Sequence, residues 1–301
     1  MGGRSYFRSL VASEVKRVFP FLRRIKGYTS RTAMMMICAV LISPLILYRA
    51  WVQFTIPYVE VVITPKCNLR CAGCANLMPC YAKTVPHVDV KTVKASIDAL
   101  LTASKRVTEL KLIGGEPFLH PQLSEIVQYA ANNPKIKNII ITTNGSVIPK
   151  GENLTSMVRD KVIVNISDYP MVDSGKLTNA LDQHKIKYEM VEFENWSDYG
   201  DTNKRSLPDH ILERSFRECA SAECKTILNG QLFICPRAAH GRELSIIPDS
   251  ENDFVELLHE EPKQLREKIK RLYSLPYTTA CDYCTPVWER QEIECGKQLE
   301  D

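Results

Sequence analysis

Short runs of apolar residues alternate with segments of helical periodicity along the middle of the chain. Residues 58–64 are apolar and rich in β-branched side chains, which is typical of a strand buried on both faces. Further predicted strands lie at 110–113, 139–143, 162–166 and 186–193, and predicted helices at 89–101, 121–131 and 174–181. We expect Asp89 to cap the first helix and Ser174 the last. The alternation predicts an α/β fold with parallel strands and right-handed crossovers.

Polar residues follow four of the predicted strands. Cys67, Glu116, Asn144 and Ser167 each come soon after a strand has ended. In parallel sheets and barrels, ligands bind at the carboxyl ends of the strands. We therefore expect the functional site at this edge of the sheet.

The regular alternation ends near Trp196. Residues 196–218 are polar and predict a connecting segment. The turn signal Asn229-Gly230 predicts a β-hairpin over residues 225–235, and Pro262 is expected to begin a last helix. We divide the chain into an N-terminal helical extension (1–57), a main α/β domain (58–200) and a smaller C-terminal domain (201–301).

The first 50 residues differ from the rest in charge and hydropathy. They contain nine Lys or Arg residues and a single Glu, and residues 1–31 resemble an amphipathic surface helix. The uncharged run at 32–48 is at the lower limit for crossing a bilayer, and Ser43-Pro44 interrupts it. We expect this segment to pack on the main domain or to contact a membrane surface through residues 1–50. The expected location is cytoplasmic, with membrane association as the alternative.

Composition limits the class of function. The hydrophobic fraction of 45% and the charged fraction of 25% are those of an ordinary globular protein. The net charge of +4 comes from the basic N-terminal segment, so the rest of the chain lacks a general nucleic-acid footprint. We expect no nucleic-acid partner.

The chain has 11 cysteines, an odd number with tight spacings, which favours metal-bound thiolates over disulfides. Cys67, Cys71 and Cys74 are separated by three and then two residues and can converge on one face of a loop. Soft sulfur ligands select iron–sulfur clusters, zinc or copper(I). Because zinc and most clusters take four protein ligands, a trio indicates a cluster with one open iron.

Two further motifs accompany the trio. Gly-Gly-Glu-Pro occupies 114–117 after the second predicted strand, and Thr-Asn-Gly occupies 143–145 after the third. With these motifs the sequence resembles the radical S-adenosylmethionine (SAM) superfamily over residues 58–193. The resemblance implies a partial (β/α)6-type barrel in which the trio holds a [4Fe–4S] cluster and SAM binds its open iron.

The resemblance also implies contacts from the protein to SAM. The backbone and carboxylate of the Gly-Gly-Glu-Pro turn are expected to receive the ammonium group of SAM, and strand-end residues its ribose. The implied SAM-binding residues are Gly114, Gly115, Glu116, Pro117, Asn144, Asn165 and Ser167. An ordinary strand-end turn is the alternative for Ser167. Many family members have an aromatic residue before the third cysteine; because this chain has Gly73 there, adenine must be contacted from elsewhere.

The C-terminal cysteines resemble the auxiliary-cluster domains of the SPASM or twitch type. Cys219, Cys235, Cys281 and Cys284 are expected to bind a second [4Fe–4S] cluster, and Cys224 could replace Cys219. A zinc site is the alternative, since four cysteines in two groups also suit zinc. Two [4Fe–4S] clusters and SAM are therefore the expected cofactors.

The implied activity is reductive cleavage of SAM to a 5′-deoxyadenosyl radical, which removes a hydrogen atom from the substrate. The expected partners are an electron donor of the flavodoxin or ferredoxin type and a substrate. A peptide ranks first, by epimerisation or cross-linking of a ribosomally made precursor. Oxidation or epimerisation of a carbohydrate or aminocyclitol ranks second. The alternative from another class is a non-catalytic metal-binding scaffold.

Some polar residues remain after these assignments. Cys80 and Cys224 are candidate catalytic residues, because a free thiol can donate a hydrogen atom to a substrate radical; a buried, inert cysteine is the alternative. Arg237 and His240 could bind an anionic substrate group or simply be solvated at the surface.

Overall fold

The computed structural model describes residues 54–300. The expected N-terminal extension lies almost entirely outside these residues, as does the apolar run at 32–48. From Thr55 onward the chain groups into one compact unit. Within residues 54–300, no helix has the length and apolar character needed to cross a membrane.

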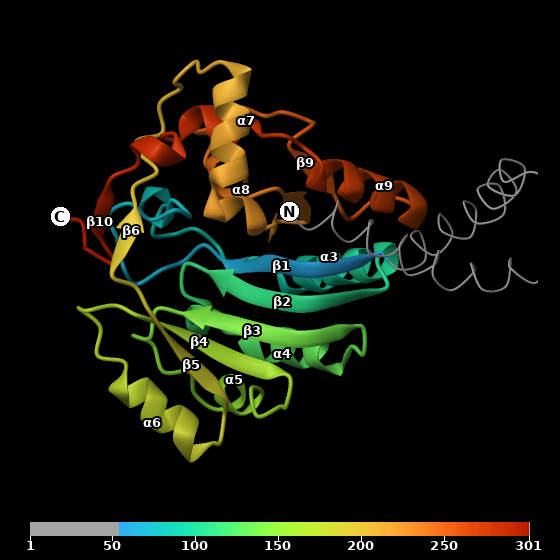
Figure 1. Ribbon diagram of the computed structural model, residues 1–301. Helices are drawn as coiled ribbons and strands as arrows, with labels where there is room; N and C mark the ends of the chain where they lie inside the picture. The colour runs from blue at the N-terminus through green and yellow to red at the C-terminus, as the bar shows by residue number, and fades with distance from the viewer. Residues whose placement is uncertain (1–53, 301) are drawn as a thin grey trace, which may run out of the picture. The chain divides into compact units, whose positions relative to one another are not determined.

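A sheet of eight strands, in the order β5-β4-β3-β2-β1-β7-β8-β9, forms the centre of this unit. Strands β1 to β5 lie side by side, and three helices, α7 (Asp209–Glu218), α8 (Pro236–Glu243) and α9 (Pro262–Tyr273), gather at the β1 side (Figure 1). The bounds of the strands are Thr55–Thr64 (β1), Arg106–Gly114 (β2), Ile136–Thr143 (β3), Val162–Asp168 (β4), Tyr188–Glu192 (β5), Thr226–Leu228 (β7), Gln231–Phe233 (β8) and Phe254–Glu256 (β9).

The pairing of the strands confirms the predicted α/β class. Strands β1 to β5 pair in parallel, and β7 also pairs with β1 in parallel, through Glu60 with Thr226. Strands β8 and β9 continue the sheet in antiparallel pairs. The C-terminal region therefore extends the same sheet as the main α/β region.

Helices connect the parallel strands, as the periodicity predicted. The predicted helices are α3 (Val90–Ala103), α4 (Leu123–Asn132) and α6 (Gly175–Gln183); the short helix α5 (Glu152–Thr155) was not predicted. Asp89 caps α3 as expected, because its carboxylate accepts from the Thr92 N–H at 3.2 Å. The expected cap by Ser174 is wrong: it stands before α6 but makes no side-chain cap, and Asp173 accepts from the Gly175 N–H instead.

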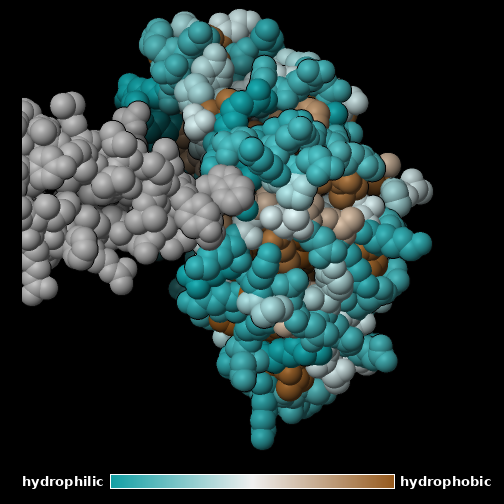
Figure 2. All heavy atoms as spheres, turned by 90° about the vertical axis from the view of Figure 1, so that its right-hand side faces the viewer, coloured by the Kyte–Doolittle hydropathy of each residue, from teal (hydrophilic) through white to brown (hydrophobic). Residues whose placement is uncertain are grey.

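The core lies between the sheet and these helices. Ile139 and Ile141 on β3 and Val164 on β4 are fully buried, and α4 contributes Leu123 and Ile126. Burial of each such side chain stabilises the fold by about 1.5–3 kcal/mol. On the face of the molecule shown in Figure 2, hydrophilic side chains predominate and hydrophobic ones form small separate spots.

The C-terminal region contains several elements that the sequence pattern missed. The expected connecting segment at 196–218 includes helix α7 (Asp209–Glu218), which has few apolar residues and buries Leu212 and Ser215. The hairpin at 225–235 is confirmed by β7 and β8, and the helix from Pro262 by α9 (Pro262–Tyr273). Helix α8 (Pro236–Glu243) follows the hairpin and is buried over most of its length.

The last residues return to the main α/β region. Strand β10 (Glu292–Glu294) pairs with β6 (Asn195–Ser197) in an antiparallel two-stranded sheet. These strands lie at the end of the molecule toward which β2 and β3 point (Figure 1). Beyond β10, Gln298 forms an isolated antiparallel bridge with Cys71, which brings the C-terminal segment beside the cysteine loop.

Candidate functional site

The loop after β1 carries the three closely spaced cysteines. Cys71 is buried with 8% of its surface exposed, and Cys67 and Cys74 are partly buried. Burial raises the pKa of all three thiols, that of Cys67 to about 11. All ten cysteines among the described residues are free, in agreement with the expectation against disulfides.

Gly114 and Gly115 bring the end of β2 against this loop. A Cβ atom on Gly114 would lie 2.1 Å from the Thr64 carbonyl oxygen, and one on Gly115 would lie 2.3 Å from the Lys66 oxygen and 2.7 Å from Cys67 Cβ. Backbone hydrogen bonds close the contact, from the Gly115 N–H to Thr64 and from the Glu116 N–H to Lys66, both at 2.8 Å. Only glycine permits so close an approach.

Glu116 connects two of the turns. Its side chain is fully buried and accepts from the Phe118 N–H at 3.0 Å, the Thr143 hydroxyl at 2.8 Å and the Asn144 N–H at 2.8 Å. Burial raises the pKa of this carboxyl to about 7, and the three hydrogen bonds oppose the rise. Glu116 thus orders the Gly-Gly-Glu-Pro turn, and Pro117 begins the short 3-10 helix Pro117–Leu119.

Asn144 joins the third turn to the cysteine loop. Its amide Nδ2 donates to Asn68 Oδ1 at 3.1 Å and lies 3.9 Å from Cys67 Sγ. The ends of β1, β2 and β3 therefore meet around Cys67, as the sequence pattern predicted.

Two buried oxygen atoms on the sheet lack partners. Thr142 on β3 and Asn165 on β4 stand opposite each other, on the face away from the fully buried Ile141 and Val164. The Thr142 hydroxyl and the Asn165 Oδ1 are buried without a hydrogen-bond partner. Since buried polar atoms are normally paired, they suit a polar ligand on this face of the sheet.

Tyr169 is a site residue that the sequence reasoning missed. It follows β4 directly and is hydrogen-bonded to Ser167. Burial raises its pKa, and the nearby thiols of Cys71 and Cys74 add to the rise. The ring of Tyr169 also packs edge-on against Trp196, with 5.4 Å between centroids. An aromatic residue just past a strand end was the available signal.

A second cysteine group surrounds a cavity in the C-terminal region. Cys219, Cys235, Cys281 and Cys284 line a pocket with about 370 Å³ of empty space, part of it open to solvent. Cys219 ends α7, Cys235 precedes α8, and Cys281 and Cys284 lie in and after the 3-10 helix Thr279–Tyr283. Within residues 54–300, no three His, Cys, Asp or Glu side chains are grouped to hold a single metal ion.

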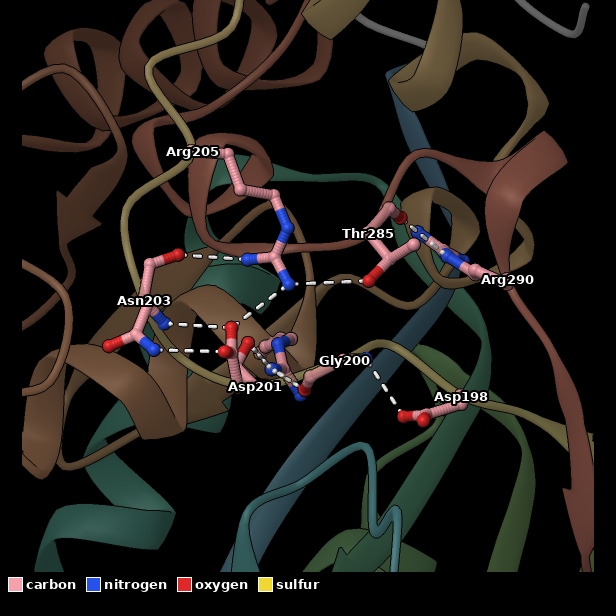
Figure 3. A network of polar contacts seen from close by, with 8 residues as sticks. Asp198, Gly200, Asp201, Asn203, Arg205, Thr285 and Arg290 are labelled. Atoms are coloured by element: carbon pink, nitrogen blue, oxygen red, sulfur yellow. Dashed lines mark hydrogen bonds and ion pairs between the residues drawn. The ribbon is translucent and has the colours of Figure 1, made fainter.

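A network of polar contacts adjoins this cavity, and Arg290 is the member of the network that lines it. Arg205 donates to Asp201 at 3.0 Å and to the Thr285 hydroxyl at 3.3 Å, and Arg290 donates to the Thr285 carbonyl at 2.9 Å (Figure 3). Arg290 also lies 3.6 Å from Cys219 Sγ. These contacts tie the segment after β6 to the residues that follow Cys284.

Cys224 and Cys80 lie apart from the cavity. Burial raises the pKa of Cys224 to about 12, and Glu60, in the middle of β1, adds to the rise. Cys224 does not line the pocket. Cys80 is exposed at the end of the 3-10 helix Met78–Cys80, close to the first cysteine loop.

Arg237 and His240 on α8 are both buried, so the interpretation as solvated surface residues is wrong. Arg237 donates to the carbonyls of Gly200 and Asp201 at 3.0 and 3.2 Å. Burial raises the pKa of both Cys74 and Cys284, and the Arg237 guanidinium opposes the rise at both. Arg237 thus lies near a cysteine of each group.

Comparison with known proteins agrees with this geometry. Residues 61–167 match the model of the Radical SAM superfamily. The GTP 3',8-cyclase of Chlorobaculum tepidum is 36% identical over 96 residues, or 32% of this chain and 28% of the relative. The probable GTP 3',8-cyclase of Methanococcus maripaludis is 33% identical over 128 residues, or 42% and 41% of the two chains. The matches thus span less than half of either relative.

Solved structures give more distant matches. They include anSMEcpe with bound AdoMet and Cp18Cys peptide (TM-score 0.48, 10% identity, 76% of this chain and 82% of the other). BtrN in complex with AdoMet and 2-DOIA matches with a TM-score of 0.47 and 16% identity, over 82% of this chain and 100% of the other. The match to the family model, together with the cysteine loop and the parallel sheet, identifies residues 61–167 as a radical SAM domain.

Proposed function

We propose that this protein is a radical SAM enzyme with two iron–sulfur clusters that modifies a carbon–hydrogen bond of a peptide. The observation that carries the proposal is the presence of two separate cysteine groups in one compact unit. One is the loop of Cys67, Cys71 and Cys74; the other is the ring of four cysteines around the C-terminal cavity.

The residues of the first group fit a [4Fe–4S] cluster that keeps one iron for SAM. They supply three soft ligands, and the described contacts around Cys67 come from uncharged groups of the turns at 114–115 and 144. When bound, the cluster and SAM supply a 5′-deoxyadenosyl radical that removes a hydrogen atom from the substrate. The chain's own task is to hold these groups, aim them and exclude water.

The residues around the first group fit SAM. We assign the backbone of Gly114, Gly115 and Pro117 to the methionine end, with Glu116 holding the turn in place. Asn165 offers an unpartnered oxygen, and Ser167 lies beside Tyr169. We assign the aromatic side chain of Tyr169 to the adenine. It would serve in place of the aromatic residue that many family members have at the position of Gly73.

The second group fits an auxiliary cluster of the twitch or SPASM type. Cys219, Cys235, Cys281 and Cys284 provide four thiols around one cavity, and Cys219 rather than Cys224 supplies the first ligand. Arg290 and Arg237 line the same cavity. Two guanidinium groups would balance part of the negative charge of four thiolates.

Exposed apolar side chains favour a peptide over a hydroxyl-rich sugar. Met171 and Phe193 come soon after the ends of β4 and β5 and expose 42% and 37% of their surfaces. Apolar side chains at the rim of a site gain free energy by covering an apolar partner. A carbohydrate or aminocyclitol is the second candidate.

Cys80 is the better placed of the two candidate hydrogen-atom donors. It lies beside the first cysteine loop, whereas Cys224 lies beside Tyr58 and Glu60 of β1, upstream of the strand's carboxyl end. The Cys80 S–H bond would break as a new C–H bond forms on the substrate, and the external electron donor would reduce the resulting sulfur radical. We expect Cys80→Ala to keep 5′-deoxyadenosine formation and to lose the epimerised product.

Iron counting after anaerobic reconstitution tests the assignment of the clusters. The wild type should hold about eight irons per chain, and removal of either cysteine group should leave about four. One variant carries Cys67→Ala, Cys71→Ala and Cys74→Ala, and the other carries Cys281→Ala and Cys284→Ala. Cys224→Ala is the control and should keep about eight irons. Zinc instead of iron on the second group would overturn the second cluster.

Deuterium transfer identifies the substrate. Candidates deuterated at carbon are incubated with the reduced enzyme and SAM, and deuterium in 5′-deoxyadenosine is measured by mass spectrometry. The proposal expects transfer from a peptide. Transfer from an aminocyclitol alone, or from GTP, the substrate in the name of the curated relatives, would replace the peptide assignment.

A further inference from the structure

The C-terminal segment lies across the loop that carries the first cysteine group. Residues 292–299, called here the C-terminal strap, begin with β10 and continue to a bridge between Gln298 and Cys71. The Ala72 N–H donates to the Lys297 carbonyl at 2.7 Å, and the Leu299 N–H donates to the Arg70 carbonyl at 2.8 Å. The strap thus pairs with the backbone on both sides of Cys71.

The side chain of Gln298 reaches the sulfur of Cys71. Its Oε1 accepts from the Arg70 N–H at 2.7 Å, and its Nε2 donates to the Gly296 carbonyl at 2.6 Å and to Cys71 Sγ at 3.2 Å. The orientation of the amide is determined by its neighbours, because a backbone N–H can only donate and a carbonyl can only accept. An N–H of Gln298 therefore points at the Cys71 sulfur.

Close packing holds the strap in place. A Cβ atom on Gly73, where φ is +65°, would lie 2.1 Å from Ile293 Cδ1, and one on Gly296 would lie 2.9 Å from Met171 Sδ. Cys295 is fully buried and donates to the Phe193 carbonyl at 3.1 Å. The glycine before the third cysteine therefore makes room for the strap.

We propose that Gln298 is a positioning residue for the first cluster. Gln298 fixes Cys71 in the loop and donates a hydrogen bond to the Cys71 sulfur when the cluster is bound. This inference rests on the proposed role of Cys71 as a cluster ligand. Hydrogen bonds to cluster sulfurs stabilise the more negative, reduced state and so raise the reduction potential. A residue more than 200 positions away in sequence would then set how readily the first cluster accepts its electron.

The first experiment measures the reduction potential of the first cluster in the full chain. Gln298→Met keeps a side chain of similar length without hydrogen-bonding groups, and the same change at the exposed Gln291 is the matched control. An electron paramagnetic resonance titration follows the cluster whose signal responds to SAM. We expect Gln298→Met to disfavour reduction by about tenfold, or 59 mV for one electron, and Gln291→Met to match the wild type.

Hydrogen exchange provides the second measurement and does not require a cluster. Amide exchange at Ala72 and Leu299 should be several-fold faster in Gln298→Met than in Gln291→Met, because the bridge is weakened. Unchanged exchange would overturn the positioning role, and an unchanged potential with full iron content would overturn the hydrogen bond to sulfur.

Binding of the first cluster and the hold of Gln298 on the cysteine loop can be measured separately. A wild-type chain that binds no cluster on the first cysteine group would refute the proposed function, while hydrogen exchange would still test whether Gln298 holds the loop. A Gln298→Met chain that loses only the first cluster and exchanges faster at Ala72 would support the positioning role.

Discussion

The two cysteine groups are built in different ways. Cys67, Cys71 and Cys74 lie within one loop, and the ends of neighbouring strands arrange it through Gly115, Glu116 and Asn144. The second group draws its four cysteines from the end of α7, the start of α8 and the segment near 281–284. The cysteines of the first group are already close in sequence, and the edge of the sheet only orients their loop. The cysteines of the second group are far apart in sequence, so only the tertiary structure brings them together.

The difference in construction predicts a difference in tolerance. The first group is supported by close backbone contacts that leave no space for a Cβ atom. The second is supported by side-chain contacts such as those of Arg290, which lines the cavity, and of Arg205, which reaches Thr285 next to Cys284. Changes near the first group should therefore cost more than changes near the second.

The largest expected effect separates the two groups by activity. We expect Cys67→Ala to abolish reductive cleavage of SAM, by at least about a thousandfold, because the group that cleaves SAM loses a ligand. We expect Cys284→Ala to keep SAM cleavage within about tenfold while the modified product is lost. Chromatographic assay of 5′-deoxyadenosine measures both. An equal loss of 5′-deoxyadenosine formation in the two variants would contradict separate roles for the two cysteine groups.

The next effect tests the close approach at the first group. Gly115→Ala would place a Cβ atom 2.3 Å from the Lys66 carbonyl oxygen, so the end of β2 must move away from the loop. We expect a loss of about 3 kcal/mol in the free energy of unfolding, measured by urea titration. The control is Gly175→Ala at the start of α6, where φ is not positive and the nearest atom to the added Cβ is the side-chain Oδ1 of Asp173 at 3.1 Å, so we expect a change of less than about 1 kcal/mol.

A third effect concerns the contact between the two regions. His240 on α8 is fully buried, and its Nδ1 lies 2.8 Å from the Tyr81 hydroxyl, just after the first loop. Burial lowers the pKa of His240 to about 3. Because the folded state resists protonation that the unfolded chain accepts below about pH 6.5, stability should fall as the pH falls from 6.5 toward 3.

The size of this effect follows from the linkage between pH and stability. Between pH 6.5 and 5 the contribution of His240 to the free energy of unfolding should decrease by about 2 kcal/mol, while the raised pKa of Glu116 acts in the opposite direction in the wild type and in the variant alike. In His240→Asn the decrease should be smaller by that amount, with a lower stability at neutral pH. Urea titrations at several pH values provide the measurement, and equal slopes in both proteins would contradict the buried neutral imidazole.

The smallest effect tests the contacts of Arg205 beside the second cysteine group. Arg205→Ala removes hydrogen bonds to Asp201 and Thr285 from a partly exposed segment (Figure 3). We expect a loss of about 1 kcal/mol in stability and a faster loss of iron from the second group alone. Iron release to a chelator, followed over time, measures this; the first cluster should be released at the wild-type rate.

Much of the main α/β region could be predicted from sequence, because the local spacing of apolar residues indicates its strands and helices. The five parallel strands, the helices α3, α4 and α6 between them and the hairpin at Asn229-Gly230 agree with that pattern. Helix α7 was missed because it buries only Leu212 and Ser215, so its apolar signal is weak. The cap on α6 was assigned to Ser174 although Asp173 supplies it, since local sequence allowed either.

The sequence by itself determined the α/β class, the cysteine loop and the turns that follow the strands, because these features depend on residues close together in the chain. Only the tertiary structure decided that Cys219 rather than Cys224 lines the cavity. It also decided that the Glu116 carboxylate accepts hydrogen bonds within the turns, and that Tyr169 and Gln298 approach the first cysteines. These contacts join residues about 30 to more than 200 positions apart. No local periodicity encodes such a contact, because it depends on how the strands pair and where the chain returns.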